Sequence, residues 1–349
     1  AYVPGERHPR RLRALWRLLP LWKPQRVGVP FPIGIDRRHG LGPLRRVTRR
    51  ALRLPVQKQV HVPEEVYGRH MTIFGKSGMG KSKLILGLAQ WIFEQGMGAT
   101  FVDKAGDLAN DIIRLIPEDR QDDVLWIRVA DRQCPFKFNI LQSHDDDEEL
   151  DLNEELLLAL QRMSQSWGES IAYQIEMGVE TAKAVGGSRR TVYELLANSR
   201  ARDRTLAQID DPELLEFWEK FERQSDRSTA PVKRKLGRLV KHKRLGPMLS
   251  ATMSNFDADA IVRDRKIVVV DLSTGSASQQ VNIVLGTFII GKIRAAAFRQ
   301  QFKNEVDRVR HFLVVDEAKN FMHKGMDCEK IFLSARNFKL NLVLVKKTV

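Results

Sequence analysis

The sequence predicts an α/β fold in which a mostly parallel β-sheet is covered by crossover helices and interrupted by an all-helical insertion. Three observations predict it: short apolar runs alternate with helical apolar spacing, a glycine-rich turn joins one strand-like run to a helix-like one, and residues 145–254 contain only helical patterns. Strands that alternate with helices in this way are typical of parallel sheets.

Six apolar runs have the length and flanking residues of buried strands. They are predicted at residues 70–74, 99–103, 124–129, 266–272, 311–316 and 340–345. The segments "DDDEELDLNEELLLALQRM", "TVYELLAN" and "DPELLEFWEKFERQ" show i, i+3, i+4 apolar spacing instead. We therefore predict an α/β core at residues 61–144 and 255–349, with an inserted all-helical subdomain at 145–254.

The first strand and helix flank the stretch "IFGKSGMGKSKLIL". Its spacing matches the phosphate-binding P-loop, in which backbone N–H groups and a helix N-terminus surround phosphate oxygens. A turn that only connects a strand to a helix is the alternative, but the apolar strand before it and the helical spacing up to Gly96 favour the P-loop. The expected nucleotide-binding residues are Gly75, Lys76, Ser77, Gly78, Met79, Gly80, Lys81 and Ser82.

The P-loop predicts ATP and Mg²⁺ as cofactors. Lys81 is expected to contact the β- and γ-phosphates, and the Ser82 hydroxyl is expected to bind Mg²⁺. A carboxylate that holds the Mg²⁺ shell is expected at the end of a neighbouring strand, where Asp271 and Asp316 are the candidates. We choose Asp316, because Glu317 beside it can act as the base that polarises the attacking water. Asp271, which Leu272 follows, is expected to cap the next turn.

The chain's net charge of +15 is concentrated at its start. Residues 1–60 contain 15 Lys and Arg against only Glu6 and Asp36, and "RRLRALWRLLPLWKP" mixes arginines with leucines and tryptophans. Such a basic N-terminal arm is typical of contacts with an anionic membrane or a nucleic acid, and a solvated tail is the alternative. The sequence leaves open whether a membrane anchor lies upstream of residue 1.

Other features set bounds on the class of protein. Cys134 and Cys328 lie far apart without further ligands at metal-binding spacing, which favours a reducing compartment. Asn282, Lys292 and Arg294 interrupt the apolar run at 281–298, which predicts a buried helix and not a membrane span.

Two charge clusters lie in the predicted insertion. The acidic run at 145–149 is expected to stabilise a helix N-terminus, with cation binding as the alternative. The basic stretch "VKRKLGRLVKHKR" is either a solvated helix face or a phosphate-contacting surface.

Six motifs in order carry a family resemblance: "RHMTIFGKSGMGKSKL", "FVDKAGDLANDIIRLIPEDRQDDVLWI", "CPFKFNIL", "KIVVVDLSTG", "HFLVVDEAKNF" and "FLSARNFKLNLVLV". Over residues 62–345 the chain resembles the conjugative-transfer coupling ATPases of the TraG and TraD type, within the HerA and FtsK superfamily of DNA-pumping motors. The resemblance implies a RecA-like core, a ring that is usually a hexamer, and ATP-driven movement of DNA.

The resemblance also implies residue roles. Lys81 and Ser82 bind nucleotide and Mg²⁺, Asp316 is the Walker B acid, Glu317 is the catalytic base, and Arg336 reaches the neighbouring subunit's site. Two segments depart from the family pattern. The segment from Asp103 to Gly106 has no proline between the aspartate and the basic residue, where the family usually has one. Lys346 and Lys347 stand where the family usually has a glutamine that senses the γ-phosphate.

We therefore predict an ATP hydrolase that translocates DNA in conjugation or another mobile-element transfer system. The alternative is an ATPase that energises a secretion or pilus machine and moves protein. Expected partners are DNA, further copies of the chain, and membrane or secretion-channel proteins that contact the arm or upstream sequence. The expected location is the cytoplasmic face of a prokaryotic inner membrane.

Overall fold

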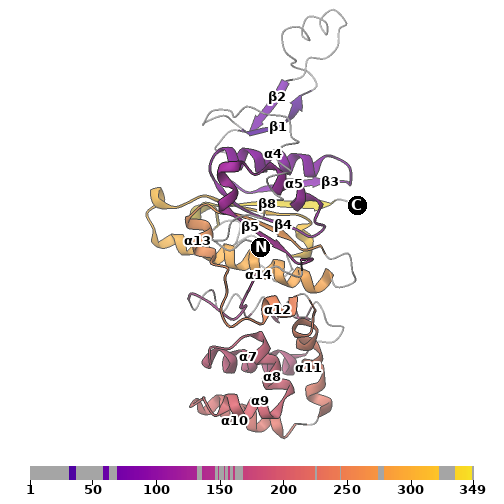
Figure 1. Ribbon diagram of the computed structural model, residues 1–349, viewed down its shortest axis with the longest axis vertical. Coiled ribbons are helices and arrows are strands. Elements are labelled where there is room, and N and C mark those ends of the chain that lie inside the picture. Colours follow the sequence, from indigo (N-terminus) through magenta and orange to yellow (C-terminus); the bar gives the residue numbers. More distant parts are fainter. Residues whose placement is uncertain are drawn as a thin grey trace, which may run out of the picture. The chain divides into compact units, whose positions relative to one another are not determined.

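The computed structural model describes residues 31–36, 58–62, 69–131, 136–145, 168–224, 226–243, 245–273, 279–321 and 335–347, together with single positions between 148 and 161. Figure 1 shows the order of the elements along the chain.

A parallel sheet of six strands forms the α/β core. Its order is β3 (Met71–Gly75), β8 (Leu340–Lys347), β7 (His311–Val315), β4 (Gly98–Asp103), β6 (Ile267–Asp271) and β5 (Val124–Arg128). The register pairs Met71 with Val343, His311 with Leu340, and Gly98 with His311. Each of the six predicted strands is confirmed, with ends that differ by no more than two residues.

The central strands are buried along their whole length. Strands β4, β6 and β7 have no exposed residue, whereas the edge strand β3 exposes Thr72 and Phe74. Continuous apolar runs such as "IVVVD" and "HFLVV" are what a strand needs when both faces of the sheet are covered. This is the reason that the strands could be predicted from short apolar runs.

Helices α4 (Lys81–Glu94) and α5 (Asp107–Leu115) pack together on one face of the sheet (Figure 1). Both crossovers advance in the same direction across the strand order, and right-handed connections then place both helices on the same face. Helix α4 turns Ile85, Leu88 and Ile92 inward, at helical spacing. A short 3-10 helix, η2 (Glu118–Asp123), leads from α5 to β5.

The described residues divide into two compact units. One comprises residues 126–258 and 271–295, and the other comprises the described parts of 4–125, 259–270 and 296–349. The division runs through β5, β6 and α14 (Gln279–Phe298), and therefore does not follow the predicted ends of the insertion. The domain boundaries at 144/145 and 254/255 stay a prediction.

Among the described residues, every regular element between β5 and β6 is a helix, as the apolar spacing predicts. The helices between residues 169 and 249 form one group in Figure 1, held partly by a cluster of Phe217, Trp218 and Phe221. The Trp218 indole donates a 2.8 Å hydrogen bond to Thr181 Oγ1, which satisfies its buried N–H. The helices are α7 (Glu169–Ala184), α8 (Arg189–Ala197), α9 (Ser199–Leu206), α10 (Pro212–Glu222), α11 (Asp226–Val240) and α12 (Leu245–Leu249), and α13 (Ala258–Arg263) follows them.

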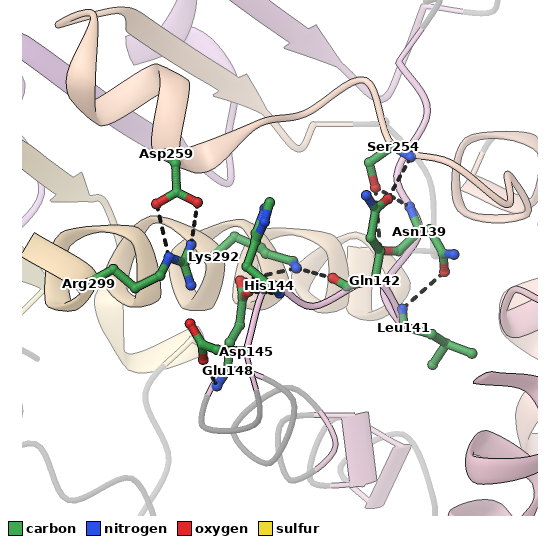
Figure 2. Close-up of polar contacts among 10 residues, drawn as sticks. All are labelled: Asn139, Leu141, Gln142, His144, Asp145, Glu148, Ser254, Asp259, Lys292 and Arg299. Atoms are coloured by element: carbon green, nitrogen blue, oxygen red, sulfur yellow. Dashed lines mark hydrogen bonds and ion pairs between the residues drawn. The ribbon is translucent and has the colours of Figure 1, made fainter. Parts of the chain in front are cut away.

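Helix α14 carries its charges inside the protein. Lys292 is buried, and its ammonium lies 3.1 Å from Glu148 Oε1 and also donates to the main-chain oxygen of Gln142 (Figure 2). The Glu148 main-chain amide in turn donates to Asp145 Oδ1 at 2.8 Å, the capping contact expected of the acidic run. Within the described residues, no helix has the length and apolar character needed to span a bilayer.

The remaining elements are short. Strands β1 (Phe31–Asp36) and β2 (Lys58–Val62) pair antiparallel inside the region predicted as a basic arm, a pairing that was not predicted. The rest of residues 1–60, including the Arg- and Trp-containing segment, lies outside the described residues. The 3-10 helices η3 (Arg299–Phe302), η4 (Glu305–Asp307), η5 (Ala318–Asn320) and η6 (Arg336–Phe338) lie in the second unit.

Candidate active site

The predicted site residues follow strands whose carboxyl ends meet at one edge of the sheet. Strand β8 separates β3 from β7, and β4 is the other neighbour of β7. The register pairs Gly75 with Lys347, and Val315 with both Leu344 and Val102. The P-loop after β3, Asp316 after β7 and Asp103 at the end of β4 therefore gather at this edge.

The P-loop has the geometry of an anion-binding turn. Gly78 and Gly80 have φ of +78° and +85°, a region that favours glycine. Gly80 precedes α4 without a side-chain cap. Among the described residues, none accepts a hydrogen bond from the main-chain amides of Gly80, Lys81 or Ser82. Unpaired amides at a helix N-terminus are the donors that bind phosphate oxygens.

Lys81 extends back over this turn. Its ammonium donates hydrogen bonds of 2.8 Å to the main-chain oxygens of Gly75 and Lys76. These contacts hold a positive charge beside the exposed loop, where the predicted phosphates would lie.

Asp316 lies in an environment that disfavours its charged form. Burial raises the pKa of Asp316, and the nearby carboxylates of Asp103 and Glu317 raise it further. The Glu317 main-chain amide and the Lys81 ammonium act in the opposite direction. Three converging carboxylates repel one another, and a divalent cation relieves such repulsion. Lys81 and Asp316 are thus close enough to interact electrostatically, as expected for the two halves of one site.

Glu317 occupies a strained turn directly after Asp316. Its φ of +47° lies in the left-handed region, and its amide donates a 2.9 Å hydrogen bond to Asp316 Oδ1. Non-glycine residues adopt this conformation only where their surroundings impose it, and such positions are common at active sites.

A third strand end contributes residues that were not predicted as part of the site. Asp103 is buried, and its two carboxylate oxygens accept from the amides of Ala105 and Ala109 at 2.8 and 2.9 Å. These bonds fix the loop that carries Lys104. Asn320, three residues after Glu317, was also missed, although its spacing from the predicted base was visible in the sequence.

Asp271 has the structural role expected of it. Its Oδ1 accepts from the amide and hydroxyl of Ser273 at 2.9 and 2.6 Å, which caps the turn after β6. Its Oδ2 lies 4.0 Å from Arg128 Nε.

Arg336 is described only in its backbone, at the start of η6; its side chain lies outside the described residues. Its assigned role therefore stays a prediction. At the end of β8, Lys346 lies beside Phe74 with its ammonium 5.9 Å from the ring centroid.

The fold matches solved structures at low sequence identity. An unbound form of the bacterial conjugative coupling protein TrwB aligns with a TM-score of 0.57 and 16% identity, over 83% of this chain and 64% of that one. The chain has the TrwB fold, of the RecA-like type. It also aligns with VirB4 of Thermoanaerobacter pseudethanolicus, with a TM-score of 0.57 and 16% identity, over 94% of this chain and 79% of that one.

A further match is TrwB in complex with ADP and Mg²⁺, with a TM-score of 0.56 and 16% identity, over 83% of this chain and 66% of that one. The chain thus spans slightly less than two thirds of the length of these two TrwB structures. No family model matches the chain, and no curated protein matches it.

Proposed function

We propose that the chain is a motor ATPase that binds ATP with Mg²⁺ at the carboxyl edge of its sheet. The observation that carries this proposal is the arrangement of Lys81, Asp316 and Glu317, because the strand order brings a P-loop lysine to a half-buried carboxylate followed by a second one. The unpaired amides of the α4 N-terminus fit phosphate oxygens. The match to TrwB in complex with ADP and Mg²⁺ adds support.

Each residue has a distinct role in the proposed reaction. Lys81 holds the β- and γ-phosphates, and the Ser82 hydroxyl and the Asp316 carboxylate hold the metal shell. Glu317 orients the attacking water and accepts its proton. When bound, Mg²⁺ would neutralise part of the negative charge that develops on the transferred phosphoryl group.

DNA is the proposed cargo, moved through a ring in conjugative or mobile-element transfer. The six motifs and the match to a structure described as a plasmid coupling protein support this choice. Helix α11 adds a basic surface with Arg234 and Arg238 exposed, and burial together with these two charges lowers the pKa of Lys235. Concentrated positive charge of this kind suits phosphate contacts.

A secretion ATPase that moves protein is the second candidate. The observation that favours it is the VirB4 match, whose TM-score of 0.57 and coverage of 94% of this chain are as good as those of TrwB in its trigonal form, 0.58 and 92%.

DNA-stimulated hydrolysis distinguishes the two candidates. We expect ATPase activity that rises with double- or single-stranded DNA at low salt and falls back at moderate salt, because phosphate contacts are screened. Lys81→Ala should nearly abolish hydrolysis, since it removes the charge that holds the phosphates. Lys83→Ala is the matched control, because Lys83 is exposed in the same helical turn.

Unchanged turnover in Lys81→Ala protein would overturn the P-loop assignment. ATPase activity that depends on Lys81 but does not respond to either DNA would reject the DNA motor and favour the protein-moving candidate.

A ring, most simply a hexamer, is the proposed assembly, with Arg336 acting on the neighbouring subunit's γ-phosphoryl group. An arginine supplied in trans is worth roughly 10³-fold or more in rate. Arg336→Ala protein should therefore bind ATP and assemble but hydrolyse slowly. Mixing it with Lys81→Ala protein should restore part of the ATPase activity, because some interfaces then pair an intact P-loop with an intact arginine. Mixed rings without recovery would assign Arg336 a structural role, as in an ion pair.

The proposed location is the cytoplasmic face of a prokaryotic inner membrane. The basic composition of residues 1–60 supports contact with an anionic membrane, with DNA, or with channel proteins.

A further inference from the structure

Two side chains from different parts of the chain hold the carboxylate of Glu317 by the same oxygen. Lys104 Nζ lies 3.3 Å from Glu317 Oε2, and Asn320 Nδ2 donates to that oxygen at 3.1 Å. Lys104 Nζ also donates to Asn320 Oδ1 at 3.4 Å. The three side chains therefore form a closed triangle of polar contacts, in which Oε2 receives two donors.

The other carboxylate oxygen has a different environment. Among the described residues, none donates a hydrogen bond to Glu317 Oε1. A carboxylate that is anchored through one oxygen keeps the lone pairs of the other for a water molecule. The two oxygens of Glu317 are thus distinguished by the protein.

Asn320 also holds the backbone of Glu317. Its side-chain amide and its main-chain amide both donate to the Glu317 main-chain oxygen, at 2.8 and 2.9 Å. These bonds close the turn in which Glu317 keeps its φ of +47°. Because a strained conformation persists only where surrounding contacts impose it, Asn320 fixes both the backbone and the side chain of Glu317.

Lys104 is itself held in place by the loop after β4. The two bonds that Asp103 accepts from Ala105 and Ala109 fix this loop, and Gly106 completes it with a φ of +93°. Lys104 and Glu317 side chains are 22% and 34% exposed. Both side chains are thus partly shielded from water, so this ion pair is less screened than one on the open surface.

We propose that Lys104 and Asn320 are positioning residues, which hold Glu317 Oε2 so that Oε1 is the oxygen that orients the attacking water. This inference rests on the proposed ATPase function. It assigns a role to the segment Asp103 to Gly106, whose departure from the family pattern left its role open. Because a base displaced by about 1 Å loses on the order of 10²-fold in rate, even small movements of Glu317 should be measurable.

The test is steady-state ATPase kinetics of Lys104→Met protein, with affinity for a non-hydrolysable ATP analogue measured in parallel. We expect kcat to fall about 10- to 100-fold while KM and analogue affinity stay close to wild type, since Lys104 acts on the base and not on the nucleotide. Lys104→Arg should recover part of the rate, because a guanidinium can donate to the same carboxylate oxygen. Lys319→Met is the matched control: Lys319 is an exposed lysine of the same turn as Asn320.

A double-variant cycle separates positioning from general damage. In a Glu317→Gln background, Lys104→Met should lower the residual rate no further, because no carboxylate remains to be positioned. An equal further loss in that background would overturn the inference, as would wild-type kcat in Lys104→Met protein.

The controls also separate this inference from the proposed function. If wild-type protein shows no ATPase activity that depends on Lys81 and Glu317, the proposed function fails. If it shows such activity and Lys104→Met has no effect, only the positioning role fails. Asn320→Ala provides a second variant, with the same expected split between kcat and KM, in case Lys104→Met protein does not fold.

Discussion

The ends of strands β7 and β6 look alike in sequence and differ in chemistry. Both are buried apolar runs that lead to an aspartate, "LVVDEA" at Asp316 and "VVVDLS" at Asp271. Asp271 uses its Oδ1 to accept two hydrogen bonds from Ser273, so its charge is used to cap a turn. Asp316 accepts from the Glu317 amide and is surrounded by the charges of Asp103, Glu317 and Lys81.

The residues that follow each aspartate thus determine its surroundings. A serine two positions on satisfies Asp271 locally, because a short side chain reaches a neighbouring carboxylate within one turn. A glutamate one position on adds a second negative charge beside Asp316 and raises its pKa together with burial. The Asp271 carboxylate is satisfied by Ser273 alone, whereas a bound cation would reduce the repulsion between Asp316 and Glu317.

The largest expected effect separates the two aspartates directly. Asp316→Asn should lower ATPase activity about 10³-fold or more and weaken Mg²⁺ binding, because a metal ligand contributes several kcal/mol to charge stabilisation. Asp271→Asn should keep activity close to wild type, since an asparagine Oδ1 still accepts from Ser273. ATPase rates measured across a Mg²⁺ titration test both. Equal losses in the two variants would contradict the contrast between the strand ends.

A smaller effect is expected from the residue that distinguishes the β7 end. Glu317→Gln should keep ATP binding but slow hydrolysis about 10²-fold or more, because an amide cannot accept the proton from water. Single-turnover hydrolysis, with nucleotide binding measured separately, tests this expectation. Normal turnover would place the base elsewhere, and Asp271 would be examined next.

The last expected effect is on stability and not on activity, and it concerns the opposite end of β7. His311 is fully buried, its Nε2 lies 2.9 Å from Thr100 Oγ1, and burial lowers the pKa of His311 to about 3, against 6.5 ordinarily. The unfolded chain therefore binds one more proton than the folded one between those values. The free energy of unfolding should rise by about 1.4 kcal/mol per pH unit across this window from this group alone.

Denaturant unfolding of wild-type and His311→Gln protein between pH 4 and about 6.5 measures this slope. The variant's free energy of unfolding should rise less steeply with pH, by about 1.4 kcal/mol per pH unit, which corresponds to one proton. Identical slopes would mean that His311 accepts its proton without unfolding. No corresponding pH dependence of stability is expected from the start of β6, because β6 begins at the apolar Ile267.

Most of the fold could be predicted from local sequence. Strands β4, β6 and β7 are buried on both faces and so appear as continuous apolar runs, and α4 follows a glycine-rich turn at which only a few residue types fit. The pairing of β1 with β2 was missed because its residues lie in a segment dominated by arginine and proline, which led us to predict an arm.

The candidate site was predictable only where its residues are adjacent in sequence. Gly75 to Ser82 form one loop, and Asp316 and Glu317 form one strand end, so spacing alone identified them. Lys104 was missed as a partner of Glu317 because 213 residues separate the two. Their contact depends on β4 being the neighbour of β7, and no local pattern encodes that strand order.

Local spacing in the sequence identified the residues that we propose for the chemistry, since a P-loop lysine, an acidic strand end and a glutamate beside it require particular residue types at fixed positions. The tertiary structure decided which of these residues act together. Pairing between distant strands is set by packing and register over the whole sheet. The contact of Lys104 with Glu317 and the proximity of Asp103 to Asp316 exist only because parallel strands bring their carboxyl ends to a common edge.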